Sequence, residues 1–138
     1  MKLDGDDLRA MVLFESITGA RVIDFMPTEE SFHFLIDSSG AGKAIGKGAE
    51  NLKRFREITG RRVNVYVHYK DEKKFVKALF RRFEVENIEV VEDANGRTAV
   101  VKVAPKDKAR AIGRKGKNVS IISEMAKKHS ELDGVRIA

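Results

Sequence analysis

The sequence of 138 residues contains no cysteine. This absence excludes disulfide bonds, thiolate metal sites and cysteine nucleophiles, and it favours a reducing compartment such as the cytoplasm. No apolar run is long enough to span a bilayer, and the acidic, polar start MKLDGDDLRA does not resemble a signal peptide. No tract rich in proline or serine interrupts the chain. We therefore expect a folded cytoplasmic protein with no membrane partner.

Positive charge is present in excess and is unevenly placed. The net charge is +6, and the apolar share of 42% is enough to build a core. The charged residues before Gly40 are mostly acidic, whereas two groups of basic residues follow. The first group is Lys43, Lys47, Lys53, Arg54, Arg56, Arg61 and Arg62, and the second is Lys106, Lys108, Arg110, Arg114, Lys115 and Lys117. Because both groups surround glycine-containing segments, they indicate a polyanionic partner.

Hydrophobic periodicity and turn residues predict one order of elements twice. In the first half we expect a helix over 4–18, strands over 21–26 and 31–37, a helix over 50–59 and a strand over 61–69. In the second half we expect a helix over 71–82, a hairpin over 84–104, helices over 105–112 and 117–129, and a strand over 134–138. The hairpin carries the strong turn signal Asn95-Gly96.

Apolar residues recur at helical spacing along these helices, and on the helix over 117–129 we expect Val119, Ile122, Met125 and Ala126 to face inward. In the first half the recurring residues are Leu8, Met11, Val12, Leu52, Phe55 and Ile58, and in the second half they are Phe75, Leu79, Phe83, Val119, Ile122, Met125 and Ala126. Each half has the size of one small α/β sandwich with a three-stranded sheet. We expect two domains, 1–68 and 69–138, joined rigidly because the sequence at Tyr69-Lys70 lacks the composition of a flexible linker.

Two related segments lie half a chain apart, AIGKGAENL at 44–52 and AIGRKGKNV at 111–119. A glycine turn between helices allows a phosphate backbone to approach, since no Cβ blocks it. The amides that open the next helix can donate hydrogen bonds to phosphate oxygens. Ile45 and Ile112 can wall a groove for the bases. Basic side chains add full charges at the tips, namely Lys47, Arg114 and Lys115.

The segment Gly113–Gly116 resembles the helix–GXXG–helix signature of KH domains, whose loop clamps about four nucleotides of single-stranded nucleic acid. The upstream copy matches at Ile45, Gly46, Lys47, Gly48, Asn51 and Leu52. Ala49 replaces the last glycine there, and we expect it to keep helical geometry because that position opens the helix.

The order of elements resembles the prokaryotic, type II form of the KH domain. Two such units in tandem over almost the whole chain resemble the short archaeal NusA-type transcription factors. The resemblance implies a non-catalytic protein that grips nascent single-stranded RNA during elongation or termination, with no cofactor and no small-molecule substrate. The RNA-binding residues it implies are Ile45, Gly46, Lys47, Gly48, Ala49, Lys53, Ile112, Gly113, Arg114, Lys115, Gly116 and Lys117.

Two other functions remain open at this point. A ribosome-associated or assembly protein could use the same fold to hold structured RNA. An RNA polymerase adaptor could use the acidic N-terminal helix and the hairpin as its contact. A metal site is not expected, because His33, His68 and His129 lie in three separate elements and the carboxylates show no repeated pairing.

Overall fold

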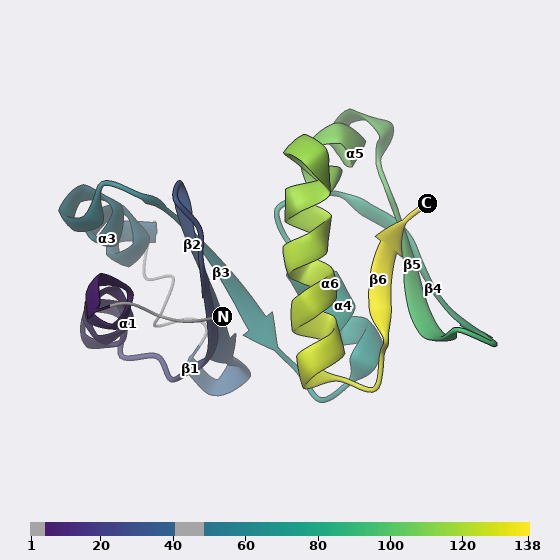
Figure 1. Cartoon of the computed structure of the whole chain (residues 1–138), viewed down its shortest axis with the longest axis horizontal. Coiled ribbons are helices and arrows are strands. Elements are labelled where there is room, and N and C mark those ends of the chain that lie inside the picture. Colours follow the sequence, from purple (N-terminus) through teal and green to yellow (C-terminus); the bar gives the residue numbers. More distant parts are fainter. Residues whose placement is uncertain (1–4, 41–48) are drawn as a thin grey trace. The chain divides into compact units, whose positions relative to one another are not determined.

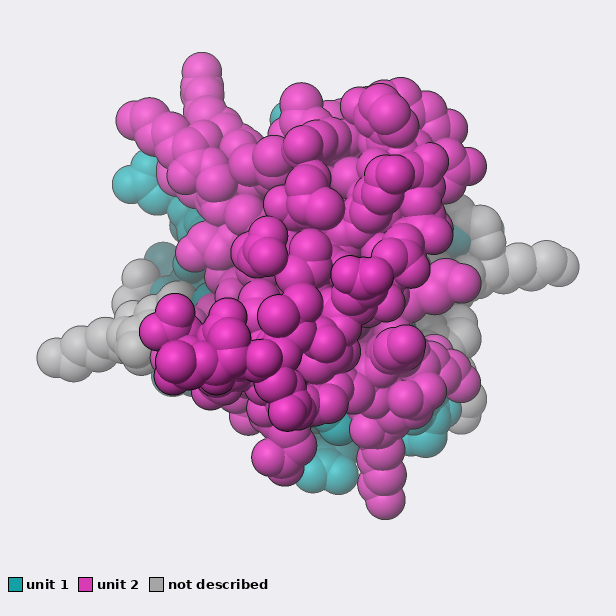
Figure 2. Space-filling model, turned by 90° about the vertical axis from the view of Figure 1, so that its right-hand side faces the viewer, with its two compact units in different colours: residues 1–68 teal, residues 69–138 magenta. Residues whose placement is uncertain are grey.

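The computed structural model of the protein describes residues 5–40 and 49–138. The chain divides into two compact units, Met1–His68 and Tyr69–Ala138 (Figures 1 and 2). Each unit contains a sheet of three strands, so the expected mixed α/β class is confirmed. In the described part of the chain, no helix has both the length and the apolar character needed to cross a membrane.

The first unit packs two helices on one sheet (Figure 1). Its elements are α1 (Gly5–Thr18), β1 (Val22–Pro27), β2 (Ser31–Asp37), a 3-10 turn (Ser38–Gly40), α3 (Glu50–Thr59) and β3 (Arg62–His68). Strand β2 lies in the centre, antiparallel to β1 and parallel to β3. Gly19 and Gly60 close the two helices, each donating its N–H to the carbonyl four residues earlier.

Phenylalanine rings form the core of this unit. The ring of Phe14 on α1 stacks on that of Phe34 on β2, with centroids 3.9 Å apart. Phe55 on α3 meets both rings edge-on, at 5.7 Å from Phe14 and 5.6 Å from Phe34. Phe14, Phe34 and Phe55 are fully buried. This aromatic cluster therefore joins α1, α3 and the sheet.

Two helix faces differ from the apolar spacing of the sequence. On α1 the buried residues are Ala10, Phe14 and Thr18, while Val12 is 62% exposed. On α3 only Phe55 is buried and Ile58 is 56% exposed, so the apolar face expected over Leu52, Phe55 and Ile58 does not lie wholly in the core. On each helix the phenylalanine packs against Phe34 of the sheet, while Val12 and Ile58 remain exposed to solvent.

The sheet of the second unit has the same strand order and strand directions as that of the first. Its elements are α4 (Glu72–Leu79), β4 (Val85–Asp93), β5 (Gly96–Val103), α5 (Pro105–Ile112), a 3-10 turn (Arg114–Gly116), α6 (Lys117–His129) and β6 (Gly134–Ile137). Strand β5 is central, antiparallel to β4 and parallel to β6. The predicted hairpin is confirmed, with Ala94 and Asn95 as its turn residues and Gly96 as the first residue of β5. The inward position of Ile122, Met125 and Ala126 on α6 is confirmed as well.

Helix α4 is shorter than the predicted helix over 71–82. It ends at Leu79, and a tight turn follows in which Phe83 donates its N–H to the carbonyl of Phe80 at 2.9 Å. The turn returns the Phe83 ring to the interior, where it is buried. The apolar spacing was therefore correct about burial, but tertiary packing rather than a continuing helix places Phe83 there.

The aromatic cluster predicts a large difference between two positions on α1. Phe14→Ala should lower the free energy of unfolding of the first unit by about 3–5 kcal/mol, because it leaves a cavity between the helices and β2. Val12→Ala, at an exposed position on the same helix, should change it by less than about 0.5 kcal/mol. Urea denaturation followed by circular dichroism measures both. Equal losses at the two positions would contradict this account of the core.

Candidate nucleic-acid interface

The turn Gly113–Gly116 connects two helices of the second unit. Helix α5 ends at Ile112, and the N–H of Gly113 still bonds to the carbonyl of Ala109 at 2.9 Å. Three residues later the N–H of Gly116 bonds to the carbonyl of Gly113 at 3.0 Å. Helix α6 then begins at Lys117. The chain thus passes from one helix to the next within four residues.

This connection requires left-handed backbone conformations. Lys115 has φ 56° and ψ 27°, and Gly116 has φ 72° and ψ 13°. A residue with a Cβ occupies this region at a cost of about 1–2 kcal/mol. The structure accepts that cost at Lys115, where a basic side chain stands at the tip of the turn. Backbone strain of this kind concentrates at functional sites.

A glycine is required at position 113 for a different reason, because Asn118 lies close to its backbone. Gly113 has φ 79°, and a Cβ built on it would lie 2.7 Å from the Cβ of Asn118 and 2.8 Å from the backbone N of Asn118. No side chain fits into that space. The first turn of α6 therefore packs directly against the backbone of the turn.

Three basic side chains at the turn are exposed to solvent and can contact a ligand. Arg114, Lys115 and Lys117 are exposed, and none of them forms an ion pair with a carboxylate of the described residues. Gly116 caps α6 without a side-chain hydrogen bond. The positive end of the helix dipole and the first backbone amides therefore face the same segment as these three cations.

Arg110 belongs to the same basic group but has a structural partner. Its guanidinium lies 2.5 Å from Oδ1 of the buried Asp107, and Oδ2 of Asp107 accepts the N–H of Glu84 at 2.8 Å. The hydrogen bond from Glu84, followed by that from Arg110, lowers the pKa of the Asp107 carboxyl below its ordinary value. Asp107 thereby ties α5 to the start of β4.

The first glycine turn is only partly within the described residues. Ile45, Gly46, Lys47 and Gly48 lie outside them, whereas Ala49 caps α3 and Lys53 is exposed on that helix. Ala49 has φ 60° and ψ 28°, which is left-handed. The expected right-handed helical geometry of Ala49 is wrong, because the chain enters α3 with nearly the same backbone angles with which Gly116 opens α6.

Sequence reasoning missed one residue that shapes the second turn. Asn118, the second residue of α6, donates its Nδ2–H to the carbonyl of Ala111 at 2.8 Å. That carbonyl lies in the last turn of α5, where intrahelical donors are lacking. Asn118 therefore closes the end of one helix from the beginning of the next. An asparagine at the same place in both glycine segments, Asn51 and Asn118, was the available signal.

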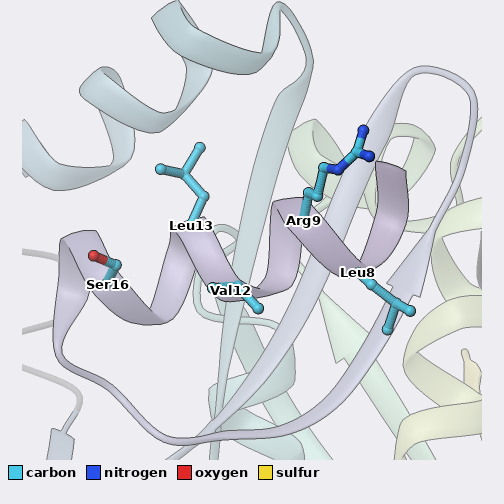
Figure 3. Close-up of a pocket in the computed structure, with 5 residues that line it drawn as sticks. All are labelled: Leu8, Arg9, Val12, Leu13 and Ser16. Atoms are coloured by element: carbon cyan, nitrogen blue, oxygen red, sulfur yellow. The ribbon is translucent and has the colours of Figure 1, made fainter. Parts of the chain in front are cut away.

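Other features do not form a second site for chemistry. Among residues 5–40 and 49–138, no three side chains of the ligating types His, Asp and Glu gather into a group that could hold a metal ion. A hollow on α1 is lined by Leu8, Arg9, Val12, Leu13 and Ser16 (Figure 3). Its single charged side chain, Arg9, pairs with Asp6 at 3.0 Å. This hollow therefore lacks the converging polar groups that a small-molecule site needs.

Comparison with known proteins identifies the family. A model described as the NusA-like second KH domain matches residues 72–135. The probable transcription termination protein NusA of Methanococcus vannielii is 31% identical over 137 residues, 99% of this chain and 79% of its own. The chain belongs to the archaeal NusA family. The resemblance predicted from the glycine turns is thereby confirmed.

Further similarity extends over the whole chain. The probable transcription termination protein NusA of Halobacterium salinarum is 26% identical, and the match covers 99% of this chain and 98% of the relative. The crystal structure of APE1850 superimposes with a TM-score of 0.70 at 33% identity, covering 99% of this chain and 100% of the other. The family similarity is thus not confined to the second unit.

The left-handed caps predict opposite effects at equivalent positions. Ala49→Gly should raise the free energy of unfolding by about 0.5–1 kcal/mol, since relief of left-handed strain exceeds the entropy cost of glycine. Gly116→Ala should lower it by a similar amount, because its Cβ meets no atom within 4 Å and only the backbone strain changes. Chemical denaturation of the two variants measures both shifts. A destabilising Ala49→Gly would mean that Ala49 is not left-handed.

The environment of Asp107 predicts a pH-dependent contribution to stability. A carboxyl with a lowered pKa stabilises the fold above its ordinary pKa, and the contribution disappears as the pH falls through its folded value. Asp107→Asn should therefore destabilise the second unit at pH 7, and the difference from the native protein should shrink below about pH 4. Urea denaturation at pH 7 and pH 3 measures this. A constant difference at both pH values would contradict it.

Proposed function

We propose that this NusA-type protein grips single-stranded RNA at the turn Gly113–Gly116. The observation that carries the proposal is a set of three cations, Arg114, Lys115 and Lys117, that pair with no carboxylate of residues 5–40 and 49–138 and surround an α6 N-terminus without a side-chain cap. Backbone amides and cations together form the donor set that phosphate oxygens accept from. A GXXG loop of this kind engages about four nucleotides.

The bases would lie beside the phosphate contacts along an apolar wall. Ile112 is half-buried at the end of α5, directly before the turn, and offers such a wall. Gly116 leaves room for the backbone of the RNA, because a Cβ at this position would meet no atom within 4 Å, whereas the space beside Gly113 is filled by Asn118. The proposed contact residues of this unit are Ile112, Gly113, Arg114, Lys115, Gly116 and Lys117.

The first unit supplies a second clamp in this proposal. The repeated strand order and the left-handed caps at Ala49 and Gly116 support two tandem type II KH domains, 1–68 and 69–138. The proposal keeps the rigid joining expected from the sequence at Tyr69-Lys70, which lacks the composition of a flexible linker. Ile45, Gly46, Lys47, Gly48, Ala49 and Lys53 are the proposed contacts of the first clamp. Two clamps on one rigid body would cover roughly eight nucleotides or somewhat more.

The biological role follows from the family. Relatives across the archaea are called probable transcription termination proteins. We place this protein in the cytoplasm at the nascent transcript, as an RNA-binding transcription factor without catalytic activity. Binding to short single strands separates this function from that of an assembly protein for structured RNA. RNA polymerase remains a candidate partner through other surfaces.

Charge reversal at the turn tests the proposal. Arg114→Asp with Lys115→Asp should weaken binding of a twelve-nucleotide single-stranded RNA more than tenfold, because two phosphate contacts become repulsive. Lys127→Asp with Lys128→Asp is the matched control, since it changes the net charge equally at the other end of α6. Fluorescence anisotropy at several salt concentrations measures affinity. The slope of log K against log salt should fall by about 1.4 in the turn variant only.

Two results would contradict the proposal. Equal weakening in both variants would mean that RNA senses only net charge, and unchanged binding in both would place the RNA elsewhere. Circular dichroism confirms that each variant is folded before affinity is compared. Stronger binding to a structured ribosomal RNA hairpin than to the single strand would favour the assembly protein.

A further inference from the structure

Arg82 lies outside the helix–turn–helix segment but contacts it. It belongs to the short connection between α4 and β4, which tight backbone hydrogen bonds hold at Phe80, Arg81 and Phe83. Its guanidinium donates from Nη2 to Oδ1 of Asn118 at 3.0 Å, across 36 residues of sequence. No carboxylate of the described residues pairs with Arg82.

The Arg82 side chain is held from a second side. Its guanidinium carbon lies 5.0 Å from the centroid of the buried Phe83 ring, within the range of a cation–π contact. The guanidinium carbon of Arg110 lies 5.7 Å from the same centroid, and Arg110 is itself paired with Asp107. The Phe83 ring therefore supports two arginines, of which Arg110 alone pairs with a carboxylate among the residues that the structure describes.

Asn118 is the point at which these contacts reach the turn. Arginine has donors only, so the atom of Asn118 that faces Arg82 must be the oxygen Oδ1. The amide nitrogen Nδ2 must then face the carbonyl of Ala111, as it does at 2.8 Å. The Cβ of the same residue occupies the space that the missing side chain of Gly113 leaves. Arg82 thereby fixes the orientation of a side chain that contacts both α5 and Gly113.

We infer that Arg82 is a positioning residue for the RNA-binding turn, acting through Asn118. It holds the Asn118 amide in one orientation, which keeps the end of α5 and the backbone of Gly113–Gly116 in the geometry that receives phosphate. The planar guanidinium is essential, because a lysine ammonium carries the same charge without the fixed fork and the flat face over Phe83. The effect on affinity rests on the proposed function, whereas the effect on the turn does not.

The inference differs from a simple charge effect. An arginine that acted by its charge alone would be replaced by lysine without loss, and its contribution would be independent of Asn118. If Arg82 is a positioning residue, both Arg82→Lys and Arg82→Gln should weaken RNA binding. In a protein that lacks the Asn118 side chain, replacing Arg82 should no longer change the affinity for RNA. A double-mutant cycle distinguishes these cases.

The experiment compares Arg82→Gln, Arg82→Lys, Asn118→Ala and the double variant Arg82→Gln with Asn118→Ala. Lys127→Gln is the control for charge, because it removes one positive charge ten residues after the start of α6, about 15 Å along the helix. Backbone amide resonances of residues 113–117 are recorded by NMR without RNA. Affinity for the twelve-nucleotide RNA is then measured by anisotropy.

We expect both Arg82 variants to shift the amide resonances of the turn and to weaken RNA binding by about tenfold, as for loss of a charge-assisted hydrogen bond. In the Asn118→Ala background, Arg82→Gln should change affinity by less than about twofold. Lys127→Gln should leave the resonances of the turn unchanged. If Asn118→Ala fails to fold, the amide resonances of Arg82→Gln and Arg82→Lys decide whether Arg82 positions the turn.

The inference is overturned if Arg82→Lys behaves as the native protein, or if the effects of Arg82→Gln and Asn118→Ala multiply independently. It is equally overturned if neither Arg82 variant changes the turn. A native protein that fails to bind RNA would refute the proposed function instead. In that case, altered resonances in RNA-free Arg82→Gln and Arg82→Lys would still support the role of Arg82 in the turn.

Discussion

The contact between Gly113 and Asn118 is the constraint on which the site depends. Helix α6 approaches the end of α5 so closely that no Cβ fits at position 113. Such an approach fixes where the first amides of α6 lie and forces the chain through left-handed conformations at Lys115 and Gly116. The exposed cations are then carried on a short, stiff connection rather than on a mobile loop.

Rigidity of this kind matters for binding a flexible polymer. A single strand loses conformational freedom when it is bound, so a protein surface that must also become ordered would reduce affinity further. In the second unit the turn is held by backbone hydrogen bonds at both glycines and by Asn118 against α5, and Asp107 anchors the first turn of α5 to Glu84 before β4. The order is therefore established at folding, before RNA arrives.

Much of the fold could be predicted because its signals are local. The strand β2 and the helices α3 and α6 begin and end where turn residues and periodicity indicate, and the hairpin predicted from Asn95-Gly96 is present. Burial was less predictable on short helices. Ile58 and Val12 are exposed, whereas Phe55 and Phe14 on the same helices are buried. The spacing of apolar residues along a helix does not show which of them will pack against the sheet.

The glycine pattern, its basic residues and its repetition were sufficient by themselves to indicate the family and the location of the second turn. These features act over nine residues, so the sequence displays them directly. Only the tertiary structure decided that Ala49 is left-handed, that Asp107 is bound to Glu84 and that Arg82 meets Asn118. The contacts of Asp107 and Arg82 join residues from separate elements, and their distances depend on how the helices pack on the sheet.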